Sequence, residues 1–311
     1  MKALKVILIT IAAIVVLAVG AVVVVINLTP NQLGAGELEI AEGYTLKNLG
    51  LDDTKIITII KTIKNVLTPD EKAILTNQPN DEEEKSNVES SFANATVPTK
   101  EDGTTDYTSL LTTELIYDDE YLIEYKDTTL CYIFDQVVKQ SADSSDDESI
   151  KFIKSLNGSI ESFTISYADG KYTARTVVGL DTASFKKEIE DNLGDAKSLV
   201  SVPNRVYLVS YLNLTANDSG LLVTTHQSIV INDDDSPVSQ AIFKVLIGSV
   251  SENSDEGALN ELIGDALESV VKNLGSVGSA TVDSSNKVTA DKTLGTTGLK
   301  ANALTVITHT S

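Results

Sequence analysis

Cysteine and histidine, on which most metal sites and many nucleophilic sites depend, are almost missing from this 311-residue chain. Its one cysteine, Cys131, cannot form an intramolecular disulfide and lies too far from the N-terminus to carry a lipid anchor there. Its two histidines, His226 and His309, have no HExxH motif and no cysteine pair beside them. These absences exclude the common zinc sites, so we expect no metal and no cofactor.

Motifs for nucleotide binding and for serine nucleophiles are missing as well. No GxSxG precedes a predicted helix, no GxGxxG follows a predicted strand, and no Walker loop is present. Carboxylates are plentiful, but the runs at 81–84, 146–148 and 233–235 fall in predicted loops, where clustered acids are usually solvated. A weak calcium contact at 232–236 and a hydrolase built on paired carboxylates are minor alternatives. We predict that the chain is not an enzyme.

Positive charge is scarce, because 24 basic residues stand against 45 acidic ones and give a formal net charge of -21. Only Arg175 and Arg205 are arginines, and no cluster of basic residues occurs. A surface of this sign repels phosphate backbones. We therefore exclude nucleic acid as a partner.

Charged residues are absent altogether from the stretch 6–28. Its apolar part, 6–26, is long enough to cross a hydrocarbon core of roughly 30 Å as a helix with a rise of about 1.5 Å per residue. A cleavable signal peptide is the alternative, although the apolar run continues past the small residues around Ala21. Lys2 and Lys5 favour a cytoplasmic N-terminus. We predict a single-pass anchor at 1–28 in the cell membrane, with the bulk of the chain extracytoplasmic.

Composition divides the rest of the chain into three parts. Residues 29–75 form a membrane-proximal helical segment, in which isoleucines at helical spacing predict a helix over 54–67. That helix either packs on its own domain or binds the membrane surface or a partner. Residues 76–106 are acidic and polar, with Phe92 as the only aromatic residue, and predict a flexible linker. Residues 107–311 are the predicted extracytoplasmic α+β domain.

Hairpins followed by helices recur in this last part. Segments 160–180 and 205–231 each contain two strand patterns around a turn, and helical patterns follow them at 182–193 and 237–247. A looser copy spans 111–138. This order is either a structural repeat or the chance recurrence of a common unit. The predicted fold is α+β: an N-terminal transmembrane helix, then a curved antiparallel sheet packed with amphipathic helices.

The strands at 205–231 carry bulky residues on both faces, so the sheet must be covered twice. Either a helix covers one face and a second sheet the other, or one face lines a cavity for an apolar ligand. The longest amphipathic pattern, at 255–275, is the predicted helix against this sheet. The candidate apolar groove consists of Leu262, Ala266, Val270, Val209 and Tyr211.

The single N-terminal anchor and the long hairpins FTISYADGKYTARTVVGLD and VYLVSYLNLTANDSGLLVTTHQSIVIN resemble the tubular lipid-binding (TULIP-like) superfamily. That superfamily includes small membrane-anchored extracytoplasmic proteins of Gram-positive bacteria. The similarity covers roughly 110–310 and rests on element order and apolar pattern. It implies a curved sheet wrapped around a helix, with lipid held along the groove.

Two functions follow as hypotheses. The first is a non-enzymatic, membrane-anchored envelope protein that binds a lipid or another apolar ligand. The second is an envelope interaction scaffold with a dry core, whose Ile-rich helix at 54–67 docks a protein partner.

Overall fold

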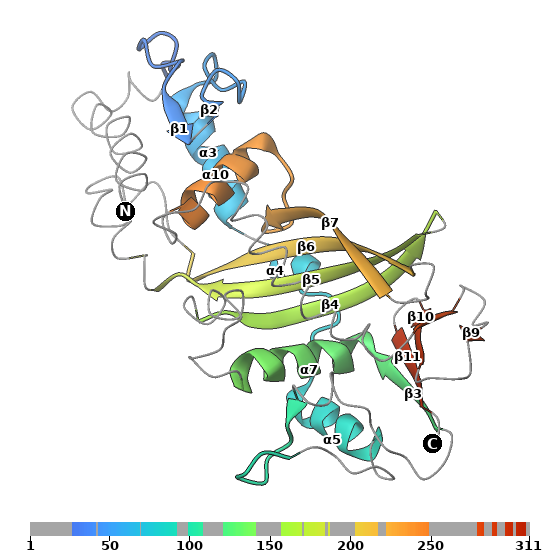
Figure 1. The fold of residues 1–311 in the computed structure, drawn as a ribbon. Helices are drawn as coiled ribbons and strands as arrows, with labels where there is room; N and C mark the ends of the chain where they lie inside the picture. The colour runs from blue at the N-terminus through green and yellow to red at the C-terminus, as the bar shows by residue number, and fades with distance from the viewer. Residues whose placement is uncertain are drawn as a thin grey trace. The chain divides into compact units, whose positions relative to one another are not determined.

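The computed structural model of the chain combines helices with antiparallel sheet, which confirms the α+β class (Figure 1). It describes residues 27–41, 43–68, 70–91, 99–107, 121–140, 157–169, 171–183, 186, 203–216, 222–248, 279–282, 288–290, 296–300 and 303–308. These residues form two compact units. One is drawn from 27–74, 180–208 and 230–248, and the other from 75–179, 209–229 and 279–308.

The first unit pairs helix α3 (Ile56–Leu67) with helix α10 (Pro237–Gly248). Strands β1 (Glu39–Ala41) and β2 (Tyr44–Thr45) form a small antiparallel ribbon, and β1 also contacts α10. The short helix α4 (Glu71–Ile74) follows α3. The predicted helix at 54–67 is confirmed, and Ile56, Ile59, Ile60 and Val66 on its apolar stripe are buried. Because packing against α10 helps to cover this stripe, the helix packs on its own domain.

A four-stranded antiparallel sheet confirms both predicted hairpins. Its strands, in spatial order, are β4 (Ser159–Ala168), β5 (Lys171–Asp181), β6 (Arg205–Ala216) and β7 (Leu222–Ile231). Strands β5, β6 and β7 contribute residues to both units. At the β4–β5 turn, Asp169 has a φ of 51°, the left-handed conformation that a tight hairpin turn requires. The helix after the second predicted hairpin is α10, whereas most of 182–193 lies outside the described residues.

The second unit builds a mixed sheet from segments far apart in the sequence. Strand β3 (Tyr121–Lys126) pairs with β11 (Ala303–Thr308), not with a neighbouring hairpin partner among the described residues. The full order is β3-β11-β10-β8-β9, and only the β10–β8 pair is parallel. The remaining strands are β8 (Ser279–Val282), β9 (Val288–Ala290) and β10 (Thr296–Lys300).

Helix α7 (Asp127–Gln140) forms the core of the second unit with β4. It follows β3 directly and lies along β4 in Figure 1. Phe134 packs edge-to-face against Phe163 of β4, with ring centroids 5.0 Å apart. Both rings are completely buried. The apolar pattern that predicted a helix in this part of the chain is therefore the stripe that holds α7 on the sheet.

The predicted flexible linker needs correction over residues 81–91, which form helix α5 (Asp81–Ser91). Two side chains of this helix, Glu84 and Val88, are buried, and α5 packs against α7. All four residues of its first turn are acidic, and negative charge at a helix N-terminus is stabilising. The acidic run that predicted a solvated linker is therefore the start of a helix.

No helix in the described part of the chain combines the length and the apolar composition needed to cross a membrane. The predicted anchor at 6–26 lies outside that part, and so do the predicted helix at 255–275 and the polar insert at 141–149.

Candidate functional site

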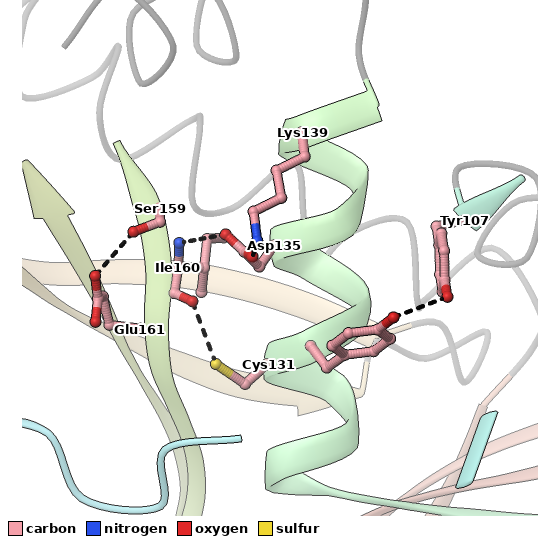
Figure 2. A network of polar contacts seen from close by, with 8 residues as sticks. Tyr107, Cys131, Asp135, Lys139, Ser159, Ile160 and Glu161 are labelled. Carbon is pink, nitrogen blue, oxygen red and sulfur yellow. Dashed lines mark hydrogen bonds and ion pairs between the residues drawn. The ribbon is translucent and has the colours of Figure 1, made fainter. Parts of the chain in front are cut away.

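Polar side chains of α7 bind the backbone of β4, which is an edge strand of the four-stranded sheet (Figure 2). The amide of Ile160 donates to Asp135 Oδ1 at 3.0 Å, and the Cys131 thiol donates to the carbonyl of Ile160 at 3.6 Å. The amide of Ile165 donates to Asp127 Oδ2 at 3.1 Å. We name this set of contacts the α7–β4 seam. It occupies backbone groups that an uncovered edge strand would present to other chains.

The spacing of the seam follows from helix geometry on one side and a strand irregularity on the other. Asp127, Cys131 and Asp135 are each four residues apart, so they share one face of α7. Ile160 and Ile165 are five residues apart, so in a regular strand their backbone N–H groups would point to opposite edges. The register of β4 on β5 shifts between Ile160 and Ser162, which brings both backbone groups to the outer edge.

In the C-terminal half of the seam, a lysine neutralises the charge of the Asp135 carboxylate. Asp135 pairs with Lys139 at 2.5 Å, and their side chains are 9% and 51% exposed. Burial works to lower the pKa of Lys139, but its hydrogen bond to Asp135 and the charge of that group outweigh burial and raise the pKa. On β4, Ser159 donates to Glu161 at 2.8 Å (Figure 2). Asp135 therefore has both a positive partner and a backbone donor.

The N-terminal end of the seam differs, because the buried Asp127, 3% exposed, has an Oδ1 with no hydrogen-bond partner in the part of the chain that the structure describes. Burial raises the pKa of Asp127 to about 7, against the opposing effect of the bond from Ile165. This carboxyl group therefore changes charge near neutral pH.

Helix α5 docks on the first turn of α7 through another carboxylate. The Thr129 hydroxyl donates to Glu84 Oε2 at 2.6 Å, and Asn87 donates to the same oxygen at 3.1 Å. Burial works to raise the pKa of Glu84, but hydrogen bonds from Thr128, Thr129 and Asn87 outweigh it and hold that pKa below its usual value. The first turn of α7 thus contains both the proton-sensitive Asp127 and Thr129, whose hydroxyl binds Glu84.

The chemistry available at the seam is limited. Burial and the charges of Asp135 and Glu161 raise the pKa of the Cys131 thiol well above its ordinary value, so it stays protonated and is a poor nucleophile. Asp127 and Asp135 are eight residues apart on one helix, about 12 Å along its axis, beyond the separation of a glycosidase pair. The described residues hold no group of three or more His, Cys, Asp or Glu that could bind a metal ion.

Of the predicted groove residues, the structure describes Val209 and Tyr211, which lie on one face of β6. Val209 is completely buried. Tyr211 is half-buried, and its hydroxyl accepts a hydrogen bond from Arg175 Nε at 3.3 Å. Leu262, Ala266 and Val270 lie outside the described residues, so the groove stays a prediction.

The α7–β4 seam was not predicted from the sequence. One signal for it exists: Asp127, Cys131 and Asp135 repeat at helical spacing beside the apolar residues of the same helix. Carboxylates so close to a buried stripe need partners, and an edge strand supplies them.

Comparison of the chain with models of protein families, with curated proteins and with solved structures finds no match in any of the three.

Proposed function

We propose that this chain is a non-enzymatic, membrane-anchored extracytoplasmic protein that binds a lipid or another apolar ligand. The observation that carries the proposal is the two-sided apolar character of β6. Val206 and Leu208 are buried on one face of this strand, and Val209 on the other. The order β6, β7, α10 is one of the two hairpin-and-helix units on which the resemblance to tubular lipid-binding proteins rests.

The membrane part of the proposal rests on the sequence at 6–26 and its lysine flank. An anchored protein with a net charge of -21 meets lipid, other envelope proteins and small molecules rather than nucleic acid. The ligand face would be the one that carries Val209 and Tyr211, with Leu262, Ala266 and Val270 of the predicted helix opposite it.

The alternative is an interaction scaffold with a dry core, whose partner is another envelope protein. The complete burial of Val209 favours it, because a residue on a ligand face need not be covered by its own chain. The Ile-rich helix is a poor docking element for such a partner, since its apolar stripe is buried inside the first unit.

A matched pair of substitutions separates the two functions. Val209→Phe adds a ring on the proposed ligand face, and Val206→Phe makes the same change on the other face of β6. In a ligand groove the new ring occupies ligand space, so Val209→Phe leaves stability nearly unchanged and lowers bound lipid. Val206→Phe overpacks a buried site in both readings and costs about 1–3 kcal/mol.

The measurement is mass spectrometry of organic extracts from the purified fragment 27–311, together with its thermal unfolding. Reproducible lipid in the wild type and its loss in Val209→Phe support ligand binding. A clean wild-type extract, with both variants equally destabilised, supports the scaffold and contradicts the lipid proposal.

A further inference from the structure

The two ends of the α7–β4 seam are unequal. Both use an aspartate to accept a backbone N–H of β4, but Asp135 has Lys139 beside it, whereas Asp127 has no cation paired with it among the described residues. Oδ1 of Asp127 also has no hydrogen-bond partner within the described ranges of the chain. An ionised carboxylate in that position is buried without compensation, which is unfavourable.

The charged groups around Asp127 do not remove this imbalance. Helix α5 brings Glu84, which is occupied by Thr129 and Asn87, and strand β3 ends at the exposed Lys126, which acts on Glu84. Strand β4 brings Glu161, which accepts from Ser159. On α7 itself the charged groups are Asp135 and Lys139, paired two turns away. Among the described residues, none of these groups supplies a positive charge that pairs with Asp127.

We propose that the first turn of α7 is a proton-controlled latch, closed on β4 while Asp127 is protonated and released from Ile165 when Asp127 ionises. The protonated carboxyl group still accepts the Ile165 amide and carries no buried charge. The carboxylate gains water only if the turn opens, and opening frees the outer edge of β4 at Ile165. The half of the seam held by Asp135 and Lys139 stays closed in both states. The latch does not depend on the proposed ligand.

The direction of the effect follows from linkage. The pKa of Asp127 is about 7 in the closed state, against an ordinary value of 3.8 when it reaches water, so closure weakens as pH rises between these values. With these two pKa values, the equilibrium constant for closure falls by about thirtyfold between pH 5.5 and 8.5.

Amide hydrogen exchange of the full chain in detergent, resolved by residue and corrected for intrinsic rates, tests the latch. The ratio of protection at Ile165 to protection at Ile160 should fall by about thirtyfold between pH 5.5 and 8.5. Ile160 is the internal control, because its acceptor is the balanced Asp135. A ratio that changes by less than about threefold overturns the proposal.

Two variants assign the effect to one group. Asp127→Asn keeps an acceptor for Ile165 without the charge, so the ratio should become independent of pH, and a fall that persists contradicts the latch. Asp135→Asn should leave the fall at Ile165 in place. If Asp127→Asn does not fold, the carbon-13 titration of the wild-type Asp127 carboxyl decides. A midpoint near 7, accompanied by a shift of the Ile165 amide, supports the latch, and a midpoint near 4 overturns it.

Discussion

Replacing Asp135 by alanine tests how much its cap on the edge of β4 contributes to stability, compared with its ion pair to Lys139 within α7. Asp135 makes two contacts, the bond from the Ile160 amide and the pair with Lys139. A hydrogen bond to a charged acceptor contributes about 1.5–3 kcal/mol. An i,i+4 ion pair contributes about 0.3–0.5 kcal/mol, and Lys139 is 51% exposed. The strand cap therefore outweighs the ion pair.

Asp135→Ala should accordingly lower the free energy of unfolding by about 2–3 kcal/mol, because it leaves the Ile160 amide without an acceptor. Lys139→Ala, which removes only the ion pair, should cost less than about 0.5 kcal/mol. Asp135→Asn keeps a neutral acceptor for the Ile160 amide, so its loss in the free energy of unfolding should lie between those of the two alanine variants. Urea denaturation followed by far-ultraviolet circular dichroism measures all three, since the chain has no tryptophan to report by fluorescence. If Lys139→Ala costs as much as Asp135→Ala, the stabilising contact of Asp135 is the ion pair within α7, and the argument for edge capping is wrong.

Glu84→Ala should cost about 1–2 kcal/mol by urea denaturation, against little for the exposed Glu82→Ala, and equal costs would mean that α5 does not dock through Glu84. Because the pKa of Glu84 is lowered in the fold, its contribution should be present above pH 4.5 and disappear as pH falls through the lowered value; a contribution that persists in acid would contradict this sign. Cys131 should stay unmodified by a thiol reagent until the protein is denatured, and rapid labelling of the native protein would show that α7 opens at that turn. The full-length protein should stay in the membrane after alkaline carbonate washing with its N-terminus intact, whereas a soluble chain that begins near Ala21 would identify a signal peptide.

Local periodicity was sufficient to predict the hairpins. Strands β4 and β5 alternate in polarity around their turn, β6 and β7 flank a cluster of turn residues, and hairpin pairing needs no information from distant parts of the chain. The pairing of β3 with β11, about 180 residues later, has no such local signal. The parallel β10–β8 pair has none either. Sheet order of this kind depends on which apolar faces meet, which a single sequence does not state.

The acidic segment shows why composition failed at α5. Its sequence, DEEEKSNVESS, has one apolar residue, Val88, and composition of this kind predicts disorder. The helix nevertheless forms because of where its residues lie. Its acidic residues are at its N-terminus, where negative charge is stabilising. Val88 is buried, and Glu84 accepts a hydrogen bond from α7. The α7–β4 seam was missed because the side chains of α7 bind backbone groups of β4, and no sequence pattern marks those groups.

Photo-crosslinking in the membrane tests ligand binding on the Val209 face most directly. The full chain is reconstituted with a phospholipid that carries a diazirine in its acyl chain, irradiated, and mapped by peptide mass spectrometry. The account predicts adducts on the β6 peptide that contains Val209 and Tyr211, in addition to those on the anchor at 6–26, and Val209→Phe should reduce only the β6 adducts. Adducts confined to 6–26 would contradict the account, because they would show that the chain meets lipid only through its anchor.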